Sequence, residues 1–153
     1  MPNTKRPIAF WIIVLFLAFS IAVMLMGQTM AVFDYDLAVG FGLQESIRHV
    51  SGFGVQVNRA FGASDTVVYI PLMVVSLAGL FLRKRWSLLT TAAVVGVSAY
   101  WSVTATFMFL FLPGVSGYSY VPGPEIWFFI GVYTAFGAWG LFYLILRGDS
   151  LLR

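Results

Sequence analysis

Apolar residues along this chain gather into four long blocks that are separated by short polar segments. The blocks cover about residues 8–27, 64–82, 87–112 and 125–146. Each is close to or above the roughly 20 residues that an α-helix needs to cross a bilayer. The first block is longer than a signal-peptide core of about 7 to 15 residues, and only a weak cleavage site follows it. The pattern predicts an all-α membrane protein, a bundle of four transmembrane helices in a single domain over residues 1–153.

The polar segment at residues 34–62 interrupts this pattern and has a periodicity of its own. Its apolar positions recur with helical spacing at Leu43, Ile47, Val50, Val57 and Phe61. Such a stripe predicts an additional amphipathic helix that lies against the outer face of the bundle, between the first and second spans. Glycines inside the segment disfavour a continuous helix, so we expect a break near residues 52–54.

Two features predict how the spans are shaped and paired. Pro71 lacks an amide donor and crowds the carbonyl of Val67, so the second span should be distorted there. Spans three and four carry faces of small or hydroxylated residues, and helices in lipid associate through such faces. We therefore expect these two spans to be neighbours, and the same faces could serve a second copy or another membrane protein. The residues are Thr91, Ser98, Ser102, Thr106, Gly131, Ala135 and Ala138, with Gly137 and Gly140 nearby.

The charged residues predict the orientation of the bundle. Arg83, Lys84 and Arg85 form the only run of three charges, and they lie between two apolar blocks. With the triplet in the cytoplasm and alternating spans, seven of the nine basic residues fall inside, as the positive-inside rule requires. Both termini are then cytoplasmic. The inside residues are Lys5, Arg6, Arg83, Lys84, Arg85, Arg147 and Arg153, whereas Asp34, Asp36, Glu45, Asp65 and Glu125 lie outside.

Composition narrows the classes of function. The chain is 60% hydrophobic and 10% charged, which a soluble domain of this length could not bury. The net charge of +3 is explained by membrane orientation, so we expect no nucleic acid partner. The absence of cysteine excludes disulfides and thiolate chemistry, and the single histidine excludes a haem held by two histidines within one chain.

Few polar groups are candidates for chemistry. Glu45 and His49 are four residues apart, a spacing that on a helix lets a carboxylate orient an imidazole as a general base. The alternative is a solvated polar helix face. Asp65, just before the second span, is a candidate acid at the membrane boundary, or else an N-cap of that span. These three residues are the catalytic candidates.

A second group consists of aromatic and hydroxyl residues that are predicted to lie deep in the bundle. Tyr100 and Trp101 fall near the middle of the third span, where a phenol or indole needs an internal partner. Together with Tyr69, Ser98 and Ser102 they are candidates for binding a flat or isoprenoid-like ligand, the alternative being ordinary core contacts.

Metal sites are weakly indicated. The outer acids match no calcium-loop spacing, and Met24, Met26 and Met30 with His49 offer soft copper(I) ligands that are equally ordinary apolar filler. We expect no metal and no cofactor.

The middle third of the chain carries a resemblance to other proteins. Four segments carry it: Asp65 to Leu72, Gly79 with Leu80, the basic turn with Trp86, and Tyr100 with Trp101. These segments resemble a group of small bacterial inner-membrane proteins to which no activity is assigned. The resemblance implies a four-helix protein of the bacterial cytoplasmic membrane.

Three classes of function follow from these observations. The first is a non-enzymatic accessory subunit or a binder of a lipid-like molecule. The second is a membrane enzyme that acts on a lipid or isoprenoid through Glu45, His49 and Asp65. The third is a small oligomeric transporter or channel, although no span carries a charged residue at depth that would support it.

Overall fold

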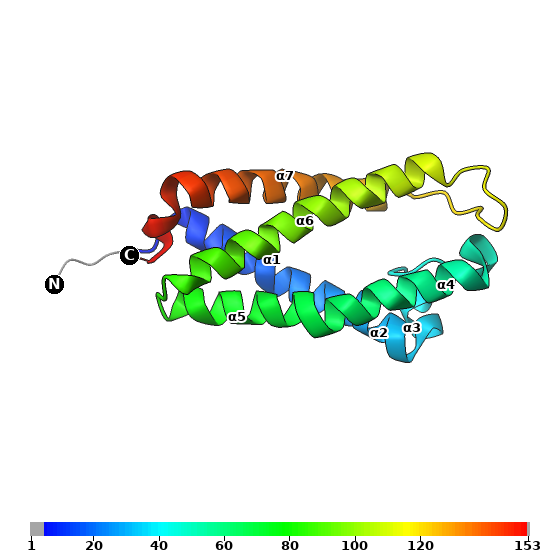
Figure 1. Cartoon of the computed structure of the whole chain (residues 1–153), viewed down its shortest axis with the longest axis horizontal. Helices are drawn as coiled ribbons and strands as arrows, with labels where there is room; N and C mark the ends of the chain where they lie inside the picture. The colour runs from blue at the N-terminus through cyan, green and yellow to red at the C-terminus, as the bar shows by residue number, and fades with distance from the viewer. Residues whose placement is uncertain (1–4, 153) are drawn as a thin grey trace.

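The computed structural model describes residues 5–152, which form helices joined by short loops and contain no β-strand (Figure 1). In chain order the elements are α1 (Ile8–Met24), the π-helical turn η1 (Leu25–Thr29), α2 (Met30–Phe33), α3 (Tyr35–Gly40), α4 (Ile47–Ser64), the π-helical turn η2 (Asp65–Tyr69), α5 (Ile70–Phe81), α6 (Trp86–Phe111), α7 (Pro124–Arg147) and the 3₁₀ turn η3 (Gly148–Leu152).

Four helices in this part of the chain are long and apolar enough to cross a membrane. They cover Ile8–Phe33, Ile47–Phe81, Trp86–Phe111 and Pro124–Leu152. The start of α1 and the turn η3 lie at the same end of the molecule as the connection between α5 and α6 (Figure 1). The predictions of an all-helical protein and of four helices able to span a membrane are confirmed.

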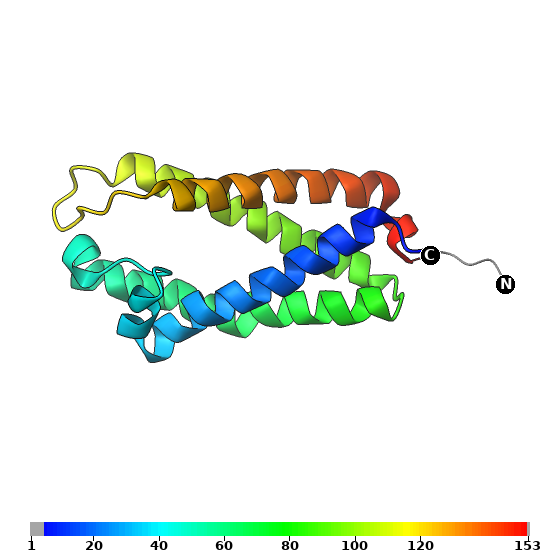
Figure 2. The same ribbon diagram turned by 180° about the vertical axis from the view of Figure 1, so that it is seen from behind.

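The second of these helices differs most from its prediction. Residues 47–81 form one long helical segment of 35 residues, built from α4, η2 and α5 and interrupted only at Ser51. At 1.5 Å per residue the part after Ser51 is about 45 Å long, whereas the hydrocarbon core of a bilayer is about 30 Å thick. This part therefore exceeds the core by about 15 Å, and α4 prolongs the second span (Figure 2). A separate helix lying against the outer face, predicted for residues 34–62, is not supported.

The reason is that α4 packs on the end of the first span. Gly62 lies so close to this neighbour that a Cβ there would come within 2.5 Å of the carbonyl oxygen of Gln28 and 3.3 Å of Val32. The Arg59 guanidinium donates to the carbonyl oxygen of Val32 at 3.0 Å. Gly62 and Arg59 make these contacts, whereas the stripe residues Ile47 and Phe61 are exposed, so the predicted stripe is not the face that packs on the first span. The backbone of α4 breaks at Ser51, where φ is 59°, one residue before the predicted break.

The two π-helical turns lie side by side, each holding one residue more than an α-helical turn. The hydroxyls of Thr29 in η1 and Thr66 in η2 share a hydrogen bond of 2.9 Å. Pro71 follows η2 closely, and its ring crowds the carbonyl four residues earlier in a regular helix. The distortion that we expected from Pro71 is therefore present as this wider turn.

Helices α6 and α7 are packed closely through glycine. A Cβ at Gly137 would lie 2.7 Å from the Cβ of Ala99 and 2.9 Å from the carbonyl oxygen of Val95. The expected pairing of the third and fourth spans is confirmed. The contact face on α7 differs from the prediction, because Gly131 faces open space and Ala135 is exposed.

Aromatic rings and hydroxyls join α1 to α7. Phe16 stacks on Phe136 with their ring centroids 3.6 Å apart, and the Tyr133 hydroxyl donates to the Ser20 hydroxyl at 2.9 Å. Beyond this contact the α6–α7 pair diverges from α1 and α4 toward the end opposite the chain termini (Figures 1 and 2).

A basic side chain ties the beginning of the chain to the end of α5. The Arg6 guanidinium donates to the carbonyl oxygens of Leu80 and Phe81, at 3.2 and 3.0 Å, and lies 4.0 Å from the ring centroid of Phe10. It thereby satisfies carbonyls that the end of a helix leaves free. Arg153, one of the predicted inside cations, lies outside the described residues.

Candidate binding site

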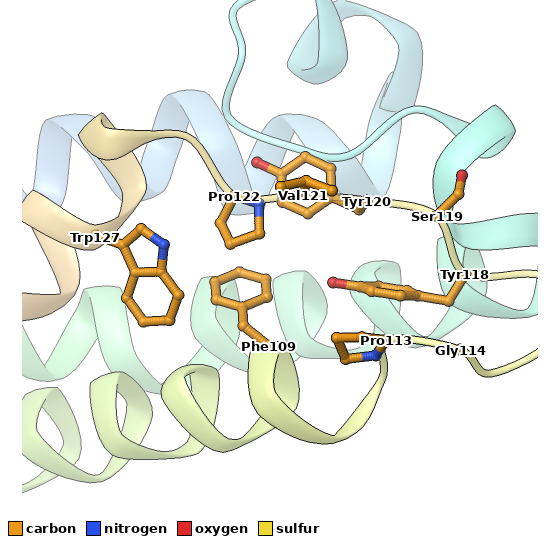
Figure 3. Close-up of a pocket in the computed structure, with 9 residues that line it drawn as sticks. All are labelled: Phe109, Pro113, Gly114, Tyr118, Ser119, Tyr120, Val121, Pro122 and Trp127. Carbon is orange, nitrogen blue, oxygen red and sulfur yellow. The ribbon is translucent and has the colours of Figure 1, made fainter.

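An aromatic pocket lies where the loop between α6 and α7 turns back toward the bundle (Figure 3). Its volume is about 380 Å³. The loop reverses through Gly114 and Gly117, whose φ angles of 87° and 82° are strained for any residue with a Cβ. The lining includes Phe109 from α6, Trp127 from α7, and Pro113, Tyr118, Tyr120 and Pro122 from the loop.

The rings of the pocket are arranged around Phe109. Its centroid is 5.9 Å from that of Tyr120 and 5.8 Å from that of Trp127, which meets it edge to face at 70°. The Tyr118 hydroxyl is directed toward Phe109 and Pro122 (Figure 3). This hydroxyl is buried and has no hydrogen-bond partner among residues 5–152. Buried hydroxyls are normally paired, so this unpaired one is an exception within the loop.

Two carboxylates give the pocket a negative electrostatic environment. Burial raises the pKa of the Tyr118 phenol, and the negative charge of Glu45 raises it further. Burial also raises the pKa of Tyr120, with further contributions from Glu45 and Glu125. Both phenols therefore stay neutral at physiological pH.

The loop is anchored to the first turn of α4 through His49. The Ser119 amide donates to the carbonyl oxygen of His49 at 2.8 Å, and the His49 Nδ1 atom is 3.3 Å from the Ser119 hydroxyl. The His49 ring lies edge-on to Tyr120, with centroids 6.4 Å apart. His49 thus anchors the loop that supplies seven of the nine residues lining the pocket.

Glu45 makes a different set of contacts. The Asn58 amide donates to its carboxylate at 2.7 Å, and the Tyr35 hydroxyl donates to its carbonyl oxygen at 2.9 Å. Helix α4 begins at Ile47 with Ser46 as its N-cap, so Glu45 precedes the helix and does not face His49 one turn later. The structure therefore does not bring together the two residues that we considered as an acid–base pair.

Asp65 lies inside the long second helix, in the π-helical turn η2, and does not cap the start of a span. It is about 24 Å along the helix from Phe81. Its Oδ2 atom is buried and has no hydrogen-bond partner within the described chain.

The deep ligand candidates are mostly engaged with one another. Tyr69 and Ser98 share a hydrogen bond of 2.6 Å, and the Thr134 hydroxyl donates to that of Ser102 at 2.9 Å.

The two aromatic candidates of the third span point different ways. The Trp101 ring centroid is 6.0 Å from that of Tyr133, within the bundle. Tyr100 is 74% exposed and is not brought to the others. Tyr69, Ser98, Ser102 and Trp101 thus make interior contacts between helices.

The pocket itself was not among the sites predicted from sequence. Tyr118, Tyr120 and Trp127 resemble interfacial aromatic residues, and only a loop rich in proline and glycine between them could have signalled a concave surface. Among the described residues, no three His, Asp or Glu side chains gather as metal ligands.

Comparison with known proteins supplies no relative. No protein-family model, no curated protein and no solved structure matches this chain. The resemblance noted in the sequence therefore stays a prediction, and the geometry of the chain itself is what bears on its function.

Proposed function

We propose that this chain is a protein of the bacterial cytoplasmic membrane, with both termini in the cytoplasm, that binds a lipid-like small molecule without catalysis. The observation that carries this proposal is the aromatic pocket at the end of the bundle opposite the chain termini. Concave sites lined by aromatic side chains, with few polar groups, are the usual form of small-molecule sites in proteins.

The position of the pocket supports a ligand with an apolar part. Phe109 belongs to the last turn of α6 and Trp127 to the first turn of α7, so the pocket adjoins the ends of two membrane-compatible helices. Trp and Tyr rings prefer this boundary between hydrocarbon and water. A molecule with its apolar part in the bilayer would reach the pocket from the side.

The separation of the acid–base candidates favours binding over catalysis. A general base has to lie within hydrogen-bond reach of its partner or substrate proton. Glu45 contacts Asn58, His49 contacts Ser119, and Asp65 lies in a different part of the long helix. The alternative of a lipid or isoprenoid enzyme that uses these three residues together therefore has little geometric support.

The test is whether a lipid-like molecule is retained at the pocket. Native mass spectrometry of protein purified in a mild maltoside detergent should show a bound small molecule. Phe109→Ala should lose it, whereas Phe142→Ala should keep it, because Phe142 is 68% exposed on α7 and lies outside the pocket. Equal retention by the two variants, or no bound molecule in the unaltered protein, would contradict the proposal.

One observation favours the transporter alternative as a second candidate. A buried carboxylate oxygen without a donor, as in Asp65, is a position where a membrane protein can take up a proton or cation. In proteoliposomes, a transporter would show a cation or proton flux that Asp65→Asn abolishes. If the unaltered protein and Asp65→Asn show the same leakage, the transporter alternative is wrong and only the binding function remains.

An accessory role would require a surface for a second chain. Gly131, Ala135 and Ala138, the predicted small-residue face of α7, are all exposed. We propose that a second copy or another membrane protein associates there. A cysteine introduced at Ala135 should then cross-link to a second chain, whereas a cysteine introduced at Ala99 should not.

A further inference from the structure

We propose that the aromatic pocket binds the trimethylammonium group of a choline-type cation. This inference rests on the proposed binding function and names the chemical class that the same site would recognise. It follows from two properties of the pocket: its aromatic walls and the sign of the nearby charges.

The walls offer the right surface for a bulky, weakly hydrated cation. Four lining side chains are aromatic, from three separate segments of the chain: Phe109, Tyr118, Tyr120 and Trp127. Each ring face carries negative charge density, and a cation within about 6 Å of several ring centroids gains from all of them. Methyl groups on the nitrogen add the burial of apolar surface, which a bare metal ion does not have.

The charges around the pocket favour a cation over an anion. None of the nine lining residues is charged, and the carboxylates close enough to act on Tyr118 and Tyr120 are those of Glu45 and Glu125. An anionic ligand would meet both carboxylates without a basic partner in the lining.

The oxygen atoms of the lining suit a hard metal cation less well than they suit a methylated ammonium group. A hard metal ion such as calcium takes six to eight oxygen ligands, and the lining offers only hydroxyl and carbonyl oxygens that are spread around the cavity.

The size of the pocket leaves room for more than the ammonium group. A volume of about 380 Å³ lies within the range of small-molecule sites, roughly 300 to 1,000 Å³. The remaining space would hold the adjoining part of the molecule. That molecule is either a lipid with a choline headgroup or a free choline-type compound, and the chemistry recognised is the same.

The test compares choline with its neutral isostere, in which carbon replaces the nitrogen. The full chain in a maltoside detergent is titrated by calorimetry with each compound. We expect choline to bind at least about tenfold more tightly, because only the cation gains from the ring faces. Trp127→Leu should weaken choline binding about tenfold, and Glu125→Gln a few-fold at low salt.

The controls separate loss of the site from loss of the fold. Trp139→Leu removes a tryptophan of the same helix about 18 Å away and should leave choline binding unchanged. Glu125 is exposed, so Glu125→Gln should fold even if Trp127→Leu does not. If choline and its isostere bind equally, the cation inference is wrong while the proposed hydrophobic binding stands. If neither binds and no lipid is retained, both are wrong.

Nanodiscs separate the two sources of the group. If a lipid headgroup fills the site, free choline should bind more weakly in phosphatidylcholine nanodiscs than in phosphatidylglycerol nanodiscs, through competition. Equal affinity in the two would assign the site to the free compound.

Discussion

A single methyl group at Gly137 provides a sharp test of how the third and fourth spans are held together. In Gly137→Ala the new Cβ would lie 2.7 Å from the Cβ of Ala99 and 2.9 Å from both the amide nitrogen of Ala99 and the carbonyl oxygen of Val95. Two of these three neighbours are backbone atoms of α6. No rotation of a side chain relieves such a contact, so the two helices have to move apart.

The size of the effect can be worked from these distances. Carbon atoms pack at about 3.5 Å or more, so the shortest contact requires a separation of about 0.8 Å. A gap of that size forfeits roughly a quarter to a half of the dispersion attraction around it. Overpacking of this kind costs about 1 to 3 kcal/mol. The intrinsic helix preference of Ala does not offset the loss, because helices that separate inside a bilayer stay helical.

Gly131→Ala is the matched control, since it adds the same methyl group to the same helix where nothing lies within 4 Å. The assay is unfolding of the protein in mixed micelles by titration with dodecyl sulfate, followed by tryptophan fluorescence. We expect Gly131→Ala to leave the free energy of unfolding within about 0.5 kcal/mol and Gly137→Ala to lower it by about 2 kcal/mol. Equal stability of the two variants would refute the close contact of α6 and α7 at Gly137.

Three further perturbations test other parts of the structure. Tyr133→Phe removes the hydrogen bond to Ser20 and should lower the free energy of unfolding by about 0.6 kcal/mol in the same titration; a gain in stability would contradict that contact. Arg6→Gln removes the guanidinium that caps the end of α5. We expect faster hydrogen exchange at residues 80–84 but not within α7, and an equal change in exchange in both places would contradict the cap. Burial raises the pKa of Tyr118, so the folded protein keeps the phenol proton at a pH where the unfolded chain has lost it. The stability linked to this proton is therefore present below about pH 10 and falls as the pH rises above it. Tyr118→Phe should therefore remove tyrosinate absorbance only above about pH 10, and a loss below that pH would contradict the buried phenol.

The four apolar helices could be predicted because their cause is local. A helix of about 20 apolar residues is long enough to cross hydrocarbon, and each block comes close to or exceeds that length without reference to any other part of the chain. The distortion before Pro71 is local for the same reason, since the ring meets its own helix.

The course of residues 34–62 shows where local reasoning stops. The apolar stripe that ends at Phe61 has the spacing of a helix, and α4 is a helix. Which face of α4 meets a neighbour depends on that neighbour: Gly62 packs on Gln28 of the first span, whereas Ile47 and Phe61 of the stripe stay exposed. The start of α4 one residue after Ser46 also decided that Glu45 and His49 do not meet.

By itself, then, the sequence determined that the four apolar blocks are helices able to cross a membrane, and at which end of the bundle most basic residues gather. The tertiary structure alone decided which face of each helix meets a neighbour. Gly131 and Gly137 are both helical glycines of one span, and only the rotation of α7 against α6 puts the second of them in the contact. It also decided the pocket, because Phe109, Tyr118 and Trp127 come together only where α6 and α7 pair and the loop between them turns back.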